Sequence, residues 1–438
     1  MKRPKAALSW AGWLWRSAHL LPTLLVAGCM LPGAFAQQSY TWQELRDKFV
    51  ASNPALQAAK LAVEESRADE ITAYLRPNPD LTATLDQINP FTKQPPPSGG
   101  ANAYAPFAYA LPSGSVSYLH ERQNKRELRR DSARQATLIA DYGSADQERS
   151  LLFNLRAAFV QTLQAKSVLR VTRENLSYWD KVLAISGDRL KAGDIAQIDL
   201  DRLELQRVQL EADLQTAEVN LRTAKIQLLQ LLNDRTPVDQ FDVTGPFDFA
   251  EQTMPLDEFR KIALDNRPDL KAALQAAEKA VVDHKLAVAN GTADPTFSID
   301  FGRNPPIPAY FGVSVNIPLR IFDKNQGEKL RTEIDIRRNE RLAAAARAQV
   351  FSDVDSAYVV VNSSVVLLKP YKAKYLQQAV RVRDTVAFAY QRGGATLLDF
   401  MTAENDYRGI QLNYLNLVGA YLTAAGQLNL AVGREVIQ

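Results

Sequence analysis

The chain has 438 residues, of which 46% are hydrophobic and 23% are charged, and its formal net charge is +3. This length allows a sizeable hydrophobic core, and this polarity excludes a protein built mainly from membrane-spanning helices.

The first 36 residues have the three parts of a secretory signal peptide: a basic start, an apolar stretch over residues 20–31, and the cleavage site Ala34-Phe35-Ala36. The basic residues of this segment are Lys2, Arg3, Lys5 and Arg16. Its removal leaves 48 basic and 49 acidic residues, a net charge of −1. The mature chain therefore has no basic excess, which excludes a nucleic-acid-binding protein.

Cys29 is the only cysteine, and it ends the sequence Val26-Ala27-Gly28-Cys29. This pattern is typical of the site where a bacterial lipoprotein is cut before a lipid-modified cysteine. Two interpretations stay open, lipidation of Cys29 and cleavage after Ala36, and the apolar residues Met30 and Leu31 favour the second. In that case the mature chain has no thiol, and so neither a disulfide nor a cysteine-based metal site.

The mature sequence consists of two similar copies. Residues 42–56 (WQELRDKFVASNPAL) match residues 256–270 (LDEFRKIALDNRPDL) at an offset of 214 positions. In both, a short helix ends before a proline, and a second helix begins with that proline in its first turn. We expect a first repeat over 37–233, a linker over 234–255 that crosses the outside, and a second repeat over 256–438.

Each copy next predicts one β-hairpin, at about residues 79–120 and 295–319, because apolar and polar residues alternate there with period two. Four strands cannot close a barrel, and an open sheet edge in lipid leaves backbone groups unpaired. Three chains would give twelve strands, which is enough for a closed barrel. The alternative is a soluble sheet that packs on a helical domain.

Long helical segments follow, over about 121–191 and 326–392, the second interrupted only by Pro370. Roughly 70 helical residues span about 100 Å. Return helices of near forty residues begin at about Ile195 and Ala395, and each carries a heptad seam whose positions lie 200 apart in the two copies. The seams are Leu203, Leu210, Leu214, Ala217, Leu221, Ala224, Leu228 and Leu231, and Ala403, Ile410, Tyr414, Leu417, Tyr421, Ala424, Leu428 and Ala431. Helices of this length favour a long hollow tube or an extended coiled coil.

No segment after the leader offers about 18 consecutive apolar residues, since the best candidate, 358–368, is short and holds Asn362, Ser363 and Ser364. After the leader only His120 and His284 remain, too few for a histidine metal site. No phosphate-binding glycine loop and no nucleophile motif appear. We therefore expect neither an enzyme nor a bound cofactor or metal.

The helix-to-helix turns LKAGDIAQID (190–199) and YQRGGATLLD (390–399) also repeat at an offset of 200. Each has a glycine, Gly193 or Gly393, followed six residues later by an aspartate, Asp199 or Asp399. Taken alone, each turn is typical of an ordinary glycine C-cap.

The chain resembles the TolC-type outer-membrane efflux family over nearly its whole mature length. The resemblance rests on the tandem copies, the NPAL and RPDL openings, VNIPLRIFDKNQG (315–327) and YQRGGATLLDF (390–400). It implies a homotrimer in the outer membrane of a Gram-negative bacterium, with a twelve-stranded β-barrel in the lipid and a long α-helical tunnel in the periplasm. Its partners would be a periplasmic adaptor protein and an inner-membrane transporter.

The resemblance also implies roles for the turn residues. Asp399 would line the tunnel aperture, and Asp199 would be linked in the closed state to an arginine and to Tyr390. In this chain the position of that arginine is occupied by Ala395, so Arg189 or Arg392 would have to replace it. The position of a second acid at the aperture is occupied by Thr402. The adaptor would contact the tips at Gly193, Asp194, Gly393 and Gly394.

The expected function is a passive exit duct of a tripartite efflux pump. Residues 44–68 and 189–206 look most like the cobalt-zinc-cadmium-type efflux components, which implies heavy-metal cations as cargo. The alternatives are an exit duct for a protein-secretion or multidrug exporter and, from another class, a structural periplasmic coiled-coil protein without a channel.

Overall fold

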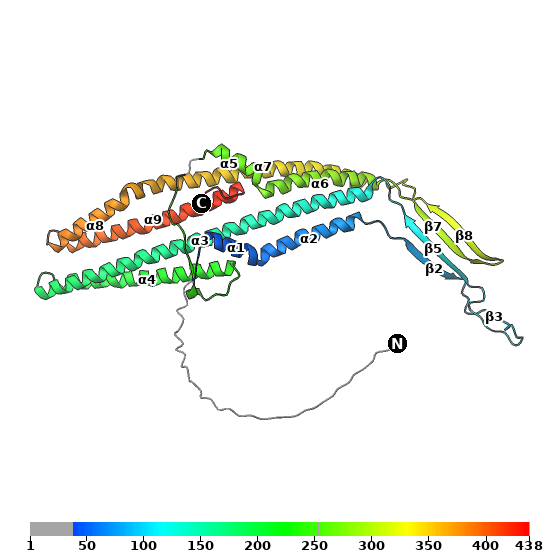
Figure 1. The fold of residues 1–438 in the computed structure, drawn as a ribbon, viewed down its shortest axis with the longest axis horizontal. Helices are drawn as coiled ribbons and strands as arrows, with labels where there is room; N and C mark the ends of the chain where they lie inside the picture. Colours follow the sequence, from blue (N-terminus) through cyan, green and yellow to red (C-terminus); the bar gives the residue numbers. More distant parts are fainter. Residues whose placement is uncertain (1–37, 252–253, 438) are drawn as a thin grey trace, which may run out of the picture.

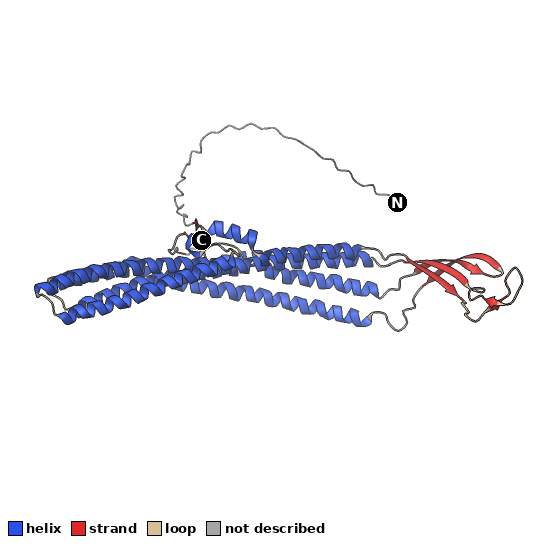
Figure 2. Cartoon of the chain, turned by 90° about the horizontal axis from the view of Figure 1, so that it is seen from below, coloured by secondary structure: helices blue, strands red, loops and turns tan. Residues whose placement is uncertain are grey.

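The computed structural model describes residues 38–251 and 254–437. It is an elongated helical body that carries a small β-sheet at one end (Figures 1 and 2). The predicted fold class, mainly helical with a small β part, is confirmed. The predicted signal peptide and Cys29 lie outside the described residues.

The elements of the two copies follow the same order. The first copy contains α1 (Trp42–Ser52), α2 (Pro54–Tyr74), β2 (Asp80–Asp86), β5 (Leu111–Leu119), α3 (Lys125–Ala192) and α4 (Gln197–Leu231). The second contains α5 (Leu256–Asn266), α6 (Pro268–Asn290), β7 (Thr296–Asn304), β8 (Ile307–Asn316), α7 (Gln326–Pro370), α8 (Leu376–Gln391) and α9 (Leu397–Val432).

The first two helices begin where the sequence supplies caps. Thr41 and Glu44 make a capping box at the start of α1, and the Asn53 side chain accepts hydrogen bonds from the first turn of α2, which begins at Pro54. The long helices owe their stability to packing of their apolar seams. Buried seam positions include Leu203, Leu210, Ala217, Ala224 and Leu228 on α4, and Ala403, Tyr421, Ala424, Leu428 and Ala431 on α9.

Pro370 does not end the helix in which it lies. Between α7 and α8 the backbone forms one π-helical turn, Tyr371–Tyr375. A proline lacks the N–H for the ordinary helical hydrogen bond and its ring crowds the preceding carbonyl, and a wider turn relieves both problems. The helix run therefore continues from Gln326 to Gln391.

This run is also the one part of the described chain with enough length and apolar character to cross a membrane, because an 18-residue window within it has a mean hydropathy of 1.3. Residues 358–368, which were rejected above as too short and interrupted by polar side chains, lie within this run. Only 28% of the window is buried within the chain. Length and composition do not separate a membrane span from a helix that packs in a larger assembly.

The linker between the copies does not simply cross the outside of the body, because part of it pairs with a strand and is buried. Its strand β6 (Phe241–Val243) follows a short 3-10 turn (Val238–Gln240) and pairs in parallel with β1 (Gln38–Tyr40). Phe241 and Val243 are fully buried in a core cluster with residues of α1, α3 and α4. The linker thus fastens the start of the chain to the first helix pair.

The two predicted hairpins form one antiparallel sheet in the order β2-β5-β7-β8. The register pairs Val116 of β5 with Ile299 of β7, and Ile299 with Val313 of β8. The loop between β2 and β5 carries a small hairpin of β3 (Lys93–Gln94) and β4 (Ala103–Tyr104).

The two faces of this sheet differ in polarity. One face is apolar across all four strands, and the other carries hydroxyl and carboxyl groups, with hydrogen bonds from Ser314 to Asp300 and between Thr84 and Ser113. The apolar face comprises Leu81, Ala83, Leu85, Pro112, Val116, Tyr118, Phe297, Ile299, Phe301, Phe311, Val313 and Val315. Phe297, Ile299 and Val313 are 47%, 46% and 70% exposed, so the described chain does not cover this face.

Candidate functional site at the tip of the helical body

Both helix-to-helix turns lie at the end of the body opposite to the sheet (Figure 1). Gly193 and Gly393 adopt the left-handed conformation, with φ angles of 84° and 75°. The N–H of Asp194 donates to the carbonyl of Arg189 at 2.9 Å, and the N–H of Gly394 donates to that of Ala389 at 2.8 Å. The duplicated sequence therefore folds into two equivalent glycine caps, with Asp194 and Gly394 exposed at the tips.

The two aspartates of the turns differ in what they bind. Asp399 forms a capping box with Thr396, whose hydroxyl donates to the carboxylate at 2.7 Å and whose backbone N–H donates at 3.0 Å. These hydrogen bonds from Thr396 lower the pKa of Asp399, which is exposed and stays charged. In the first copy the cap position is Ala196, which has no side chain to form such a box. Asp199 is half-buried in the first turn of α4.

Tyr390 is buried beneath the turns in an aromatic stack. Its ring stacks on Phe400 with centroids 4.9 Å apart, and Phe400 stacks on Trp179 at 5.9 Å. The Trp179 indole N–H donates to the carbonyl of Leu203 at 2.9 Å. The stack therefore joins α8, α9, α3 and α4 by aromatic contacts and one buried hydrogen bond.

Charged groups from the first helix pair act on Tyr390. Burial raises the pKa of the Tyr390 hydroxyl, the Arg189 cation lowers it and the Asp199 carboxylate raises it further. The Arg189 guanidinium lies 5.2 Å from the ring centroid, in cation–π geometry. Arg392 instead lies over Phe388 at 4.8 Å.

The structure thus brings Tyr390, Asp199 and Arg189 together and leaves Asp399 exposed on its own helix start. Sequence reasoning did not assign a role to Phe400 or Trp179, although both are large aromatic residues near the two turns. The signal was weak because each contacts the other copy, and repeat matching compares only equivalent positions.

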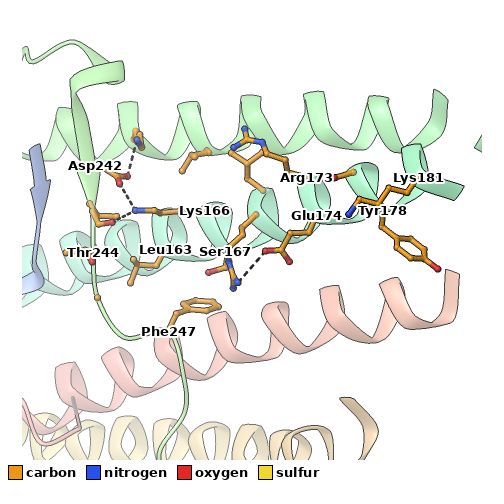
Figure 3. A pocket seen from close by; sticks show the side chains of 17 residues that line it. Leu163, Lys166, Ser167, Arg173, Glu174, Tyr178, Lys181, Asp242, Thr244 and Phe247 are labelled. Carbon is orange, nitrogen blue, oxygen red and sulfur yellow. Dashed lines mark hydrogen bonds and ion pairs between the residues drawn. The ribbon is translucent and has the colours of Figure 1, made fainter. Parts of the chain in front are cut away.

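An open groove at mid-body, with a volume of about 820 Å³, lies between α3, α4 and the linker (Figure 3). Asp242 of the linker accepts from Lys166 at 2.5 Å and lies 3.1 Å from the Lys225 amine. Burial alone would raise the pKa of Asp242, but the hydrogen bonds from the two lysines outweigh it and the pKa is lowered.

Two arginines of the groove also have acidic partners. Arg170 lies 3.8 Å from Glu174, and Arg173 lies 3.1 Å from Glu218. The lysines further donate to the backbone carbonyls of Phe241 and Val243. The ion pairs and hydrogen bonds of Lys166 and Lys225 with the linker therefore hold it on the first helix pair, and we call this set of contacts the clamp. Over residues 38–251 and 254–437, no cluster of three or more metal-ligating side chains is found.

Comparison with known proteins shows the fold. No family model and no curated protein matches the sequence. Among solved structures, that of CusC has a TM-score of 0.74 at 17% identity and covers 90% of this chain and 92% of its own. The outer membrane protein VceC of Vibrio cholerae has a TM-score of 0.69 at 16% identity, and the match covers 90% of this chain and 96% of VceC. The MtrE outer membrane channel of Neisseria gonorrhoeae has a TM-score of 0.70 at 18% identity, and the match covers 90% of this chain and 89% of MtrE. The chain has the fold of TolC-type outer-membrane efflux channels.

We predict that Asp242→Asn destabilises the protein by about 3 kcal/mol, because it leaves Lys225, whose side chain is 8% exposed, without an anionic partner. The control is Asp239→Asn on the same linker, whose pair with Arg222 is exposed and contributes less than about 1 kcal/mol. Urea unfolding followed by circular dichroism measures both.

The pH dependence of unfolding gives a second check on the same pair. Because the pKa of Asp242 is depressed, its stabilisation is complete above the ordinary value of 3.8 and is lost as the pH falls through the folded-state value. Equal losses of stability in Asp242→Asn and Asp239→Asn would contradict the clamp.

Proposed function

We propose that this chain is the outer-membrane exit duct of an efflux system in a Gram-negative bacterium. The observation that carries the proposal is the sheet, which exposes an apolar face four strands wide and a polar face behind it. Soluble proteins rarely leave so wide an apolar surface in water. The apolar face would contact lipid, and the polar face would line a water-filled lumen.

The edges of the sheet support a homotrimer. No other strand in the described part of the chain pairs with the outer edges of β2 and β8. In lipid those backbone groups must be satisfied by a partner strand, and a neighbouring copy supplies one by the same pairing. Three copies close a ring of twelve strands, and the likeness to outer-membrane channel structures supports this arrangement.

The helical body would form the periplasmic tunnel. Its α3 helix of 68 residues spans about 100 Å, and the glycine-capped turns lie at the end far from the membrane. There an adaptor protein would contact Gly193, Asp194, Gly393 and Gly394, and would connect the duct to an inner-membrane transporter. The chain would conduct passively and is not proposed to be an enzyme.

Heavy-metal cations are the cargo that we propose. Support comes from the resemblance of residues 44–68 and 189–206 to cobalt-zinc-cadmium-type components. Exposed carboxylates at the tunnel mouth, Asp399 above all, would attract cations and resist tight closure, because three like charges in a trimer repel one another.

Ile299→Lys tests the membrane role of the sheet directly. A lysine on the lipid face at the bilayer centre costs about 2–4 kcal/mol, whereas a lysine on the lumen side costs little. Ile299→Lys should therefore abolish assembly into detergent-stable, heat-modifiable trimers, and the matched variant Ser298→Lys on the polar face should assemble normally. A soluble coiled-coil protein would tolerate both substitutions and need no detergent.

Asp399→Asn should lower the cation preference of the pore in planar-bilayer recordings, since it removes three charges from the mouth of a trimer and keeps an acceptor for the Thr396 cap. Asp188→Asn, which alters another exposed carboxylate near the tip, should leave the preference unchanged. An unaltered reversal potential in Asp399→Asn would remove that residue from the aperture.

Charge changes at both tips, Asp194→Lys combined with Gly394→Asp, should weaken binding of the adaptor protein in pull-down assays. Neither site constrains the fold: Asp194 is exposed, and a Cβ at Gly394 would lie 3.6 Å from its nearest neighbour. The control is Asp257→Lys at mid-body, where the side chain is 89% exposed. Adaptor recovery equal to that of the wild type would exclude the tips as the contact.

A further inference from the structure

Glu404 is a buried acid at the boundary between the two helix pairs. It belongs to α9, its side chain is 9% exposed, and its Oε1 atom has no hydrogen-bond partner in the described part of the chain. An ionised carboxylate in such a place is unfavourable, because burial removes water without supplying equivalent hydrogen bonds. A neutral carboxyl group avoids most of that cost.

A small polar cavity adjoins this carboxyl group. Its volume is about 20 Å³, which is enough for one water molecule. The amide nitrogen of Asn175 on α3 is also buried there without a partner among the described residues. The cavity is lined by Asn175, Tyr178, Trp179, Gln206, Leu210, Glu404, Asn405 and Arg408.

The nearby cations are engaged by other groups. On α8, Arg383 pairs with Asp384 at 2.6 Å and lies 4.2 Å from the ring centroid of Tyr407. On α9, Arg408 pairs with Asp213 of α4 at 3.1 Å. No salt bridge joins Glu404 to a cation within the described residues.

The balance of these effects shifts the pKa of Glu404 upward. Burial raises the pKa of Glu404; the hydroxyl of Tyr178 and the charge of Arg383 offset part of the rise, and Asp384 adds to it. Burial also raises the pKa of Tyr178, so its hydroxyl keeps its proton.

The contact that Glu404 occupies joins the helix pairs. Between the linker and the tips, α9 packs on α3 through the stack of Phe400 on Trp179 and through a hydrogen bond from Gln164 to Asn416 at 2.9 Å. Glu404 lies one helical turn from Phe400 on the same face of α9. A change in the protonation state of Glu404 would therefore affect the packing of α9 on α3.

We propose that Glu404 is a proton-binding site that controls how firmly the α8/α9 pair is held against the α3/α4 pair. With the proton bound, α9 packs tightly on α3; without it, the buried charge loosens the contact. Because the folded-state pKa is raised, the stabilisation is complete at acid pH and is lost as the pH rises through that value. If the chain is the proposed duct, this contact sets the ease with which the mouth opens, and opening becomes harder in acid.

The duplication supplies a matched control. Glu204 occupies the equivalent position 200 residues earlier, on α4, and is exposed. It has the same side chain at the same place in the repeat but lacks the burial. Glu404→Gln keeps the shape of the side chain and removes the titration, and Glu204→Gln makes the same change where no effect is expected.

The test is amide hydrogen exchange of residues 400–411 in the full chain purified in detergent, corrected for the intrinsic pH dependence of exchange. As the pH rises from acid to alkaline values, protection in the wild type should fall when Glu404 loses its proton. Glu204→Gln should behave like the wild type, and Glu404→Gln should stay protected throughout. A wild type with constant protection, or a Glu404→Gln variant that keeps the pH dependence, would overturn the proposal.

Infrared titration provides a second readout that does not depend on the stability of a variant. The wild type should show a protonated-carboxyl C=O band that disappears over the same pH range, and Glu404→Gln should lack it. A band that persists in Glu404→Gln contradicts the assignment. Neither measurement needs channel activity, so a chain that fails to conduct would refute the proposed function and leave the proton site standing.

Discussion

The β-sheet is incomplete, and this constraint governs the rest of the molecule. Among the described residues nothing covers its apolar face or pairs with its two outer edges, and both are stable only where something else does so. Lipid covers the face in our account, and sister copies pair with the edges. In the proposed duct, the helices of the three copies would continue this ring as a tube.

The duplicated halves are alike in backbone and unlike in chemistry. Both turns end in a left-handed glycine, yet Thr396 caps its helix with Asp399, whereas Ala196 leaves Asp199 free to lie near Tyr390. Glu204 is exposed and its counterpart Glu404 is buried. The first helix pair is clamped to the linker through Asp242, which fixes one half of the body against the start of the chain. The two repeats therefore share one backbone arrangement, and sequence differences at equivalent positions give the two halves different side-chain contacts and burial.

Much of this fold was predictable from the sequence. The heptad seams, the prolines before α2 and α6, and the alternating strands each follow from local patterns with a strong physical cause. The pairing of β1 with β6 was missed because three-residue strands show no period. The small β3–β4 hairpin was missed because its glycine- and proline-rich surroundings indicate only a loop. The π turn after Pro370 was missed because a proline in a helical pattern indicates an interruption and does not specify its form.

At the tip, the glycines and aspartates were identifiable, whereas the partners of Tyr390 were not. Phe400 and Trp179 meet across the copies, and a comparison of equivalent positions gives no information on such contacts. The burial of Glu404 was equally hidden, because a glutamate in the polar stretch 404–406 looks solvated until the neighbouring helix is placed.

Cross-linking between the two sheet edges tests the central claim most directly. One cysteine at Thr82 in β2 is combined in turn with one at Gly312, Ser314 or Asn316 in β8, in a chain whose native cysteine, Cys29, lies in the leader. If three copies close a ring, at least one combination gives oxidised products that stop at a covalent trimer under denaturing conditions. Products that remain monomeric in every combination, from a protein that is a single water-soluble particle, would contradict the account.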